Sequence, residues 1–444
     1  MASISVIVPS LNVTSYIQHC LDSIKNQTFQ DLEIICVDAG STDGTLEIIE
    51  ENAASDRRIV VLHSDKKSYG YQVNIGMEHA SGRYIGIVDS DDYIEPDMYD
   101  QLFSIMESSD YDYVKCNYIV HRPLKKGCII ERLNFLSNVR YLAHIPLDYM
   151  NHSTSVYEHP ELLLGETYIW NGLYRKSFLD VNHIRVNETQ GAAWQDIGFS
   201  IHMLLCAHKI FITDQYFNHY RLGREGNSSD NPNKLNYIYQ EWKRVLDEFP
   251  IPDNEQIKRH LYARMALQFT CVYTEVLELQ NYEADSAYLN KYPWFKNILQ
   301  QALQDYNLAE LGEELYERLG LILYNPGLFA QCRKGLDEYK RESINDKLGQ
   351  ITHRNVIIFG SGIYGVDALK KMDPFDYNID AFADNNRTKW GSECAGVPVI
   401  SPEVCVRKYP DDSYLIANKM HYQEITEQLL ELGIAGDHIS YWCT

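Results

Sequence analysis

Three aspartates and a glutamate gather directly after an apolar run at residues 84–88. The run Tyr-Ile-Gly-Ile-Val predicts a buried strand, and Asp89, Asp91, Asp92 and Glu95 follow it. Residues two apart on a strand face the same way, so we expect Asp89 and Asp91 to project together. Carboxylates this close repel one another, whereas a hard divalent cation takes their oxygens as ligands and keeps substrate phosphates in its shell. The spacing therefore predicts a Mg²⁺ or Mn²⁺ site that holds a diphosphate; a solvated acidic turn is the alternative.

A further carboxylate, Asp38, ends the apolar run Leu-Glu-Ile-Ile-Cys-Val. Ligands of open α/β sheets bind beyond the carboxyl ends of the strands, so this side chain is placed to accept an N–H from a uracil or the hydroxyl hydrogens of a ribose. Residues 40–44, Gly-Ser-Thr-Asp-Gly, predict a turn that caps the next helix. At the end of the first strand, Pro9 fixes the backbone and Asn12 offers an amide. The two strand ends therefore predict one side of a nucleotide site.

The order of the stretches SVIVPSLN, LEIICVDAGSTDGT and GYQVNIGMEHASGRYIGIVDSDD resembles glycosyltransferase family 2, whose enzymes have the GT-A fold. The resemblance is dense over about the first 100 residues and thinner to about residue 230. It implies that Asp38 contacts the nucleotide base and that Asp89-Ser90-Asp91 binds ribose, metal and diphosphate, with Asp89 and Asp91 as the metal ligands. Ala39 stands where many members carry a second Asp. The nucleotide-sugar-binding residues that the resemblance implies are Pro9, Ser10, Asn12, Asp38, Asp43, Asn74, Asp89, Ser90, Arg221 and Ser228.

The resemblance also implies a general base, an Asp at a helix start in the second half of the domain. Asp196 in GAAWQDIGFSIHMLL fits this description, and the residues after it predict an amphipathic helix. A helix N-terminus stabilises an anion, so we expect Asp196 to be ionised and able to take a proton; a plain helix cap is the alternative. Trp194 and Trp170 are the candidate acceptor-binding residues, and a structural role for Trp170 is left open.

The elements that must position these residues alternate between strand and helix over the first 110 residues or so, which predicts a mostly parallel sheet covered on both faces. Residues 111–230 are mixed, and residues 231–345 show only helical, amphipathic patterns. A polar stretch at 346–354 precedes a new strand. The predicted fold class is α/β: a GT-A type, mostly parallel sheet flanked by helices, then a helical segment and a small Rossmann-like β-α-β domain. The predicted domains are a GT-A glycosyltransferase domain at 1–230, a helical domain at 231–350 and a Rossmann-like nucleotide-binding-type module at 351–444.

The C-terminal unit carries a dinucleotide-binding fingerprint between a predicted strand and helix. Gly360, Gly362 and Gly365 form a Gly-x-Gly-x-x-Gly pattern, and Asp384 ends the following strand. The unit has only about 90 residues, roughly one mononucleotide half, and no obvious catalytic set follows. We therefore expect a binding, docking or oligomerisation module rather than a second active site, with a second nucleotide site at these four residues as the alternative.

Composition excludes some classes of partner. The net charge is −22, which argues against binding to nucleic acid or to an anionic membrane surface. No stretch approaches the ~20 apolar residues of a membrane span, and the first residues show no leader pattern. The ten cysteines include no Cys-x-x-Cys pair and predict reduced thiols. We expect a cytoplasmic protein, or one that is peripheral at the inner face of the membrane, with homo-oligomerisation left open.

The sequence thus predicts a metal-dependent, inverting glycosyltransferase. Its expected donor is a nucleotide sugar, with UDP as the nucleotide, and its expected acceptor is a saccharide or a lipid-linked saccharide in surface polysaccharide synthesis. Two alternatives remain: an NAD(P)-linked sugar oxidoreductase centred on Gly360–Gly365, and a non-catalytic scaffold with a decayed transferase domain.

Overall fold

The N-terminal sheet is built from strand–helix repeats. The computed structural model describes residues 2–135, 150–223, 233–282, 292–310 and 312–442. The first four strands pair in parallel in the order β3-β2-β1-β4. They and the helices between them are β1 (Ile4–Ser10), α1 (Ile17–Lys25), β2 (Leu32–Asp38), α2 (Thr45–Ser55), β3 (Ile59–His63), α3 (Tyr69–His79) and β4 (Tyr84–Ile87). Every residue of β1 is buried, so both faces of the sheet are covered as predicted.

The remaining strands extend this sheet in antiparallel fashion. The full order is β3-β2-β1-β4-β9-β6-β10-β5, with β7 beside β6 and β8 beside β10. Their bounds are β5 (Tyr93–Ile94), β6 (Tyr113–Pro123), β7 (Cys128–Leu133), β8 (Ser153–Thr154), β9 (Gly172–Arg175) and β10 (Ile210–Arg221). The predicted fold class is confirmed: a large central sheet is flanked by helices, and its parallel part is the N-terminal half.

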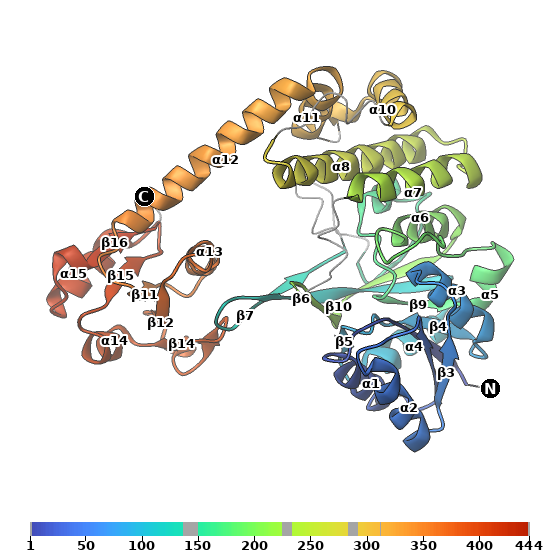
Figure 1. Ribbon diagram of the computed structural model, residues 1–444, viewed down its shortest axis with the longest axis horizontal. Coiled ribbons are helices and arrows are strands. Elements are labelled where there is room, and N and C mark those ends of the chain that lie inside the picture. Colours follow the sequence, from blue (N-terminus) through green and yellow to red (C-terminus); the bar gives the residue numbers. More distant parts are fainter. Residues whose placement is uncertain (1, 136–149, 224–232, 283–291, 311, 443–444) are drawn as a thin grey trace. The chain divides into compact units, whose positions relative to one another are not determined.

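The helices α6, α7 and α8 lie one above the other over one side of this sheet (Figure 1). The helical elements of this part are α4 (Met98–Ser108), η2 (Pro160–Leu164), α5 (Lys176–Val181), α6 (Asp196–Cys206), α7 (Lys234–Glu248), α8 (Glu255–Leu279), α10 (Pro293–Asp305), η4 (Leu308–Glu310), α11 (Glu313–Tyr324) and α12 (Pro326–Gly349). Ile7 and Ile87 of the sheet belong to the same apolar core as Trp242 of α7 and Leu261 of α8. The helices up to residue 331 therefore form one compact unit with the sheet, and the predicted division at residues 230 and 350 stays a prediction.

Helix α6 differs from its expected pattern. All residues from Ile197 to Leu205 are buried, so α6 is an apolar central helix rather than an amphipathic one. The reason is its position, because it packs between the sheet and α7 and has no face toward solvent.

The second unit comprises residues 121–131 and 332–444 and holds its own sheet. Its strand order is β13-β14-β12-β11-β15-β16, parallel except for β13. Its elements after α12 are β11 (Asn355–Phe359), α13 (Ile363–Met372), β12 (Asn378–Ala383), η5 (Arg387–Lys389), β13 (Glu393–Cys394), β14 (Val397–Ile400), α14 (Pro402–Lys408), β15 (Ser413–Ile416), α15 (Tyr422–Glu431), η6 (Gly436–His438) and β16 (Ile439–Tyr441). Val356 and Ile358 pack into one core while Ile357 and Phe359 pack into another, so both faces of β11 are covered.

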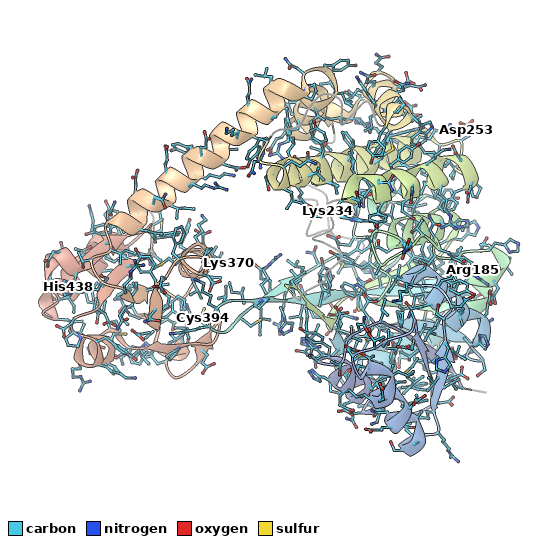
Figure 2. All side chains as sticks on the ribbon, in the orientation of Figure 1. Arg185, Lys234, Asp253, Lys370, Cys394 and His438 are labelled. Atoms are coloured by element: carbon cyan, nitrogen blue, oxygen red, sulfur yellow. The ribbon has the colours of Figure 1, made fainter. Side chains whose placement is uncertain are left out.

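The tip of the β6–β7 hairpin is part of this second unit. The backbone N–H of Lys125 donates to Asp373 at 2.8 Å. Lys370 of α13, which is labelled in Figure 2, forms an ion pair with Glu131. Gly127 has a φ of +88°, and a Cβ there would lie 2.1 Å from the carbonyl oxygen of Ala395. Glycine is therefore required at the hairpin tip.

Among the described residues, no helix is both long and apolar enough to cross a membrane.

The shared core of sheet and helices gives a stability prediction. Leu261 is fully buried in α8, whereas Leu279 at the end of the same helix is 57% exposed. We expect Leu261→Ala to lower the free energy of unfolding by about 2–5 kcal/mol because it leaves a cavity, and Leu279→Ala to lower it by less than about 1 kcal/mol. Urea unfolding measures both, and equal effects would contradict the burial of α8 in this core.

Candidate functional site

The acid cluster sits on a tight turn rather than on a strand. Strand β4 ends at Ile87, and the N–H of Asp92 donates to the carbonyl oxygen of Asp89 at 2.9 Å. Carboxylate oxygens of Asp89, Asp91 and Asp92 all lie within 4.8 Å of one another. The structure thus brings the two predicted metal ligands together, although a turn does so, and it adds Asp92 as a third carboxylate. Ser90 is buried in the same turn.

Asp92 is the buried member of the acid cluster. It is 1% exposed, and its Oδ1 accepts the backbone N–H of Arg221 at 2.8 Å. Its Oδ2 is buried and has no hydrogen-bond partner. Burial, together with the charges of Asp91 and Asp89, raises the pKa of Asp92 well above its usual range. Three oxygen donors with one unpartnered buried oxygen fit a hard divalent cation.

Tyr69, the first residue of α3, donates a hydrogen bond to the acid cluster. It was not predicted from the sequence. Its hydroxyl donates to Oδ1 of Asp89 at 2.8 Å. Burial, followed by the charge of Asp89, raises the pKa of Tyr69 well above its usual range, so Tyr69 stays a neutral donor. No spacing pattern marks a tyrosine 20 residues before its partner.

Arg221, one of the residues predicted to bind the nucleotide sugar, lies beside the cluster. Its Nη1 donates to the carbonyl oxygen of Asp91 at 2.6 Å, and its guanidinium lies 4.6 Å from the ring centre of Tyr93. Glu95, by contrast, is turned to His219, with 2.8 Å between Oε1 and Nε2. The fourth carboxylate of the motif is therefore hydrogen-bonded to His219 rather than part of the acid cluster.

The predicted nucleotide edge is formed by the ends of β1 and β2. Ser10 is paired with Asp38 in the parallel register, and Pro9 precedes it. Asp38 is 1% exposed; its Oδ2 accepts the N–H groups of Gly40 and Ser41 at 2.8 and 3.0 Å, and its Oδ1 is buried without a hydrogen-bond partner. An unpartnered buried acceptor at this edge is suited to an N–H donor of a ligand.

Asn12 and Asp43 support the turn beside Asp38. The amide oxygen of Asn12 accepts the N–H of Thr42 at 2.9 Å. Asp43 accepts the N–H of Thr14 at 3.0 Å and the hydroxyl of Thr45 at 2.6 Å. Slight burial opposes the shift, but these hydrogen bonds lower the pKa of Asp43. The hydrogen bonds of both predicted nucleotide-binding residues therefore go to the protein's own turn.

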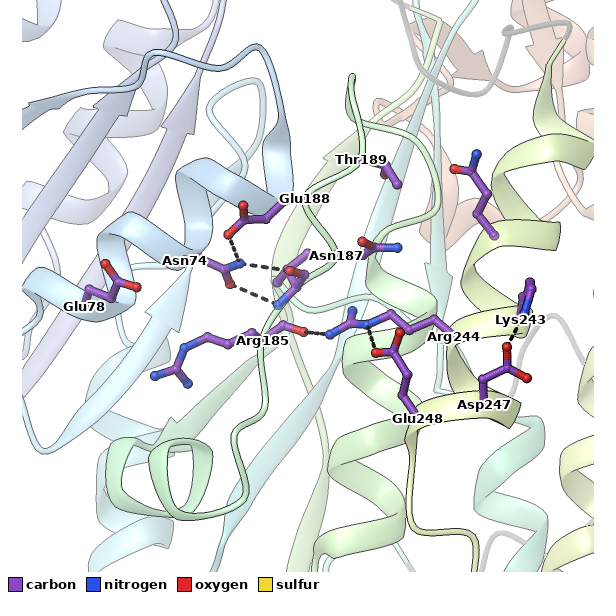
Figure 3. A pocket seen from close by; sticks show the side chains of 12 residues that line it. Asn74, Glu78, Arg185, Asn187, Glu188, Thr189, Lys243, Arg244, Asp247 and Glu248 are labelled. Carbon is purple, nitrogen blue, oxygen red and sulfur yellow. Dashed lines mark hydrogen bonds and ion pairs between the residues drawn. The ribbon is translucent and has the colours of Figure 1, made fainter.

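Asn74 was predicted to bind the nucleotide sugar, and the structure gives it another partner. Its Nδ2 donates to the carbonyl oxygen of Val186 at 2.9 Å and to Glu188 at 3.1 Å, and its Oδ1 accepts the N–H of Val186 at 3.0 Å. Figure 3 shows these bonds at the edge of a groove of about 700 Å³. The amide of Asn74 thus fixes this segment, and its role in binding the nucleotide sugar stays a prediction. Ser228 lies outside the described residues.

The groove itself is separate from the acid cluster. Its acidic lining residues are Glu78, Glu188, Asp247 and Glu248, and its basic ones are Arg185, Lys243 and Arg244. Lys243 pairs with Asp247 and Arg244 with Glu248 (Figure 3). Two of its three cations are thus already paired within the groove.

Asp196, the predicted base, is the first residue of α6 and is partly exposed. Burial of its surroundings raises its pKa to about 6, against the lowering effect of Arg264 and Lys115. The helix N-terminus does not keep the pKa low, because loss of hydration outweighs it. Lys115 and Arg264 are buried cations that the sequence did not reveal; burial lowers the pKa of Lys115 to about 7. A carboxylate that titrates near neutral pH suits proton transfer.

The two predicted acceptor-binding tryptophans differ in exposure. Trp170 is 4% exposed and is surrounded by the rings of Tyr118, Tyr168 and Tyr220. Almost no surface of this ring is open to a sugar, so the structure favours its structural role. Trp194, two residues before Asp196, is partly exposed and has a φ of +65°, and its acceptor role stays a prediction.

Beside the glycine loop of the second unit, the carboxylate of Asp384 is bonded to neighbouring residues. Gly360 has a φ of +106°, and a Cβ on Gly365 would lie 1.9 Å from the carbonyl oxygen of Gly360, while Gly362 directly precedes α13. Asp384, however, accepts the hydroxyl of Ser361 at 2.6 Å and pairs with Lys389 at 3.0 Å. Burial alone would raise the pKa of Asp384, but hydrogen bonds from Ser361, Asn386 and Lys389 lower it to about 2. The side chain of Asp384 is therefore engaged within its own unit, and the alternative of a second nucleotide site at these four residues stays a prediction.

Two parts of the chain match described families. Residues 5–146 match glycosyl transferase family 2, and residues 352–440 match a family described as C2185-like, N-terminal. The uncharacterized glycosyltransferase EpsJ of Bacillus subtilis is 29% identical over 268 residues, which is 60% of this chain and 72% of EpsJ. Glycosyltransferase GlyG of Streptococcus pneumoniae is 42% identical over 116 residues, 26% of this chain and 38% of GlyG.

A solved structure shares the fold. Residues 1–349 of TarS from Staphylococcus aureus, crystallised with UDP-GlcNAc, give a TM-score of 0.52 at 19% identity, covering 79% of this chain and 93% of that one. This likeness shows a GT-A type fold. The chain therefore carries a glycosyl transferase family 2 domain and is a glycosyltransferase.

Proposed function

We propose that this chain transfers a sugar from a UDP-sugar to a hydroxyl group of a saccharide or glycoconjugate, with inversion and with Mn²⁺ or Mg²⁺ as cofactor. The observation that carries the proposal is the group of three aspartates that bring carboxylate oxygens within 4.8 Å of one another. One of these aspartates, Asp92, also has a buried oxygen without a hydrogen-bond partner. The complex of TarS with UDP-GlcNAc supports the choice of nucleotide.

The donor half of the proposed site lies at the ends of β1, β2 and β4. Oδ1 of Asp38 accepts an N–H from the base of the nucleotide, since this buried acceptor has no partner of its own. Asp89, Asp91 and Asp92 hold the cation, which supplies Lewis-acid stabilisation of the diphosphate charge when bound. Arg221, beside Asp91 and Asp92, adds a fixed positive charge near the leaving group.

The acceptor half is centred on Asp196. Its pKa of about 6 leaves it ionised at pH 7 and able to take the proton of the attacking hydroxyl. The acceptor oxygen then attacks the anomeric carbon from the face opposite the diphosphate, which inverts that carbon. The acceptor, the polysaccharide pathway and the cytoplasmic location stay predictions.

The metal assignment predicts cation-dependent binding of UDP. We expect Mn²⁺ with UDP at ~100 times its dissociation constant to stabilise the protein by about 2.7 kcal/mol, and UDP with EDTA to stabilise it much less. Asp91→Asn and Asp92→Asn should abolish the difference, whereas Asp97→Asn, an exposed aspartate on the same segment, should retain it. Thermal unfolding measures the effect, and equal stabilisation with Mn²⁺ and with EDTA would contradict the proposal.

The base assignment predicts a loss of turnover without a loss of binding. Asp196→Asn should lower the rate of UDP release from a UDP-sugar at least ~100-fold, because proton transfer contributes about 10²–10⁴-fold. The dissociation constant for UDP with Mn²⁺ should change less than about twofold, and the exposed Asp100→Asn should leave both quantities unchanged. Turnover of Asp196→Asn at the wild-type rate would disprove the assignment.

The raised pKa of Asp196 predicts a pH-dependent difference in stability. Its folded pKa of about 6 exceeds the ordinary value near 3.9, so the folded state is stabilised by proton binding at low pH and loses this stabilisation as the pH rises through 6. Relative to wild type, Asp196→Asn should therefore gain up to about 3 kcal/mol between pH 4 and pH 7.

An aspartate whose pKa is shifted in the opposite direction provides the control. Asp180 is paired with Lys176 and Arg185; burial raises its pKa, but these partners lower it overall. Asp180→Asn should thus be less stable than wild type by a nearly constant amount between about pH 4 and pH 7, because the advantage of a lowered pKa is lost only as the pH falls below about 4. Urea unfolding across this pH range measures both variants, and a pH-independent difference for Asp196→Asn would show that its pKa is not raised.

A further inference from the structure

The segment that leads to the base is bound to the N-terminus of α3. The backbone N–H of Tyr69 donates to the carbonyl oxygen of Gly191 at 2.9 Å, and the N–H of Gly191 donates to the carbonyl oxygen of Lys67 at 2.9 Å. The N–H of Gly70 donates to Oε1 of Gln195 at 3.1 Å. The first N–H groups of a helix have no partner inside the helix, so here a distant segment satisfies two of them.

The close approach of the two segments depends on one glycine. A Cβ on Gly70 would lie 1.9 Å from the carbonyl oxygen of Asn187, a distance that no side chain tolerates. Asn74, one turn further along α3, holds Val186 by two hydrogen bonds. The segment 186–195 therefore lies along α3 through contacts at both of its ends.

Gln195 occupies the central place in this arrangement. It is 2% exposed; its Oε1 accepts from Gly70, while its Nε2 donates to Oγ1 of Thr189 at 2.8 Å and to the Thr189 carbonyl oxygen. Its backbone continues directly into Asp196, the first residue of α6. The side chain of Gln195 thus donates and accepts hydrogen bonds at once. An amide can do both, whereas an ionised carboxylate can only accept.

A short path thus joins the two halves of the site. Asp89 accepts from Tyr69 at 2.8 Å, the next residue is Gly70, and its N–H reaches the side chain of Gln195, the neighbour of Asp196. We propose that Gln195 is a positioning residue, which fixes Asp196 relative to the acid cluster by joining the N-terminus of α3 to the segment before α6. This inference rests on the proposed function, because it assigns the two halves their roles.

The proposed role predicts which kinetic quantity changes. A misplacement of a catalytic group by about 1 Å costs up to ~100-fold in rate, whereas nucleotide binding depends on side chains that Gln195 does not touch. We expect Gln195→Met, which keeps the length but has no polar group, to lower the rate of UDP release from UDP-GlcNAc with Mn²⁺ by about 10- to 100-fold. The dissociation constant for UDP with Mn²⁺ should change less than about twofold.

Partial restoration distinguishes positioning from a general loss of structure. Gln195→Glu can still accept from Gly70 but cannot donate to Thr189, so its rate should lie between those of wild type and Gln195→Met. The matched control is Gln101→Ala, since Gln101 is exposed on α4 and should leave the rate unchanged.

Two results would overturn the inference. One is a rate for Gln195→Met within about twofold of wild type. The other is a parallel loss of UDP affinity and turnover in both Gln195 variants, which would show a structural role only. Failure of the proposed function is distinguishable, because wild-type protein would then neither bind UDP with Mn²⁺ nor release it from any UDP-sugar.

Discussion

Mutual repulsion of three carboxylates at the end of β4 is the constraint on which the site depends. Their oxygens lie within 4.8 Å of one another, and Asp92 is buried at 1% exposure. Such a group is tolerated only when protonation, hydrogen bonds or a cation offset the charge. Tyr69 and the backbone N–H of Arg221 each donate one hydrogen bond, and the unpartnered oxygen of Asp92 leaves a place for a cation.

The helices around the sheet help to set the proton affinity of Asp196, at the other end of the site. Arg264 belongs to α8 and Lys115 to β6, and both are buried and lower the pKa of Asp196, which burial raises to about 6. The helical segment therefore shares the core of the sheet and contributes the charge of Arg264 near the candidate base. Helix α6, buried along its length, holds that base on a rigid element.

Local patterns predicted much of the fold and part of the site. Apolar runs of strand length and helical spacing located β1 to β4 and the helices between them, since burial on both faces leaves a direct signature in the sequence. The amphipathic helix expected after Asp196 was wrong, because burial between sheet and α7 was not visible in one segment. Trp170 and Asn74 were predicted binding residues, with a structural role left open for Trp170. Their side chains pack against or bond to the protein itself, and such long-range contacts leave no local pattern in the sequence.

The sequence by itself determined which chemistry stands at the strand ends. Asp38 ends β2 and the aspartates follow β4, and the parallel sheet brings these adjacent strand ends to one edge. Only the tertiary structure decided the partners of these groups. Tyr69 and Asp89 are 20 residues apart, and Gly70 and Gln195 are 125 residues apart. Hydrogen bonds over such separations follow from how whole elements pack, and that packing is set by the shared core rather than by any local pattern.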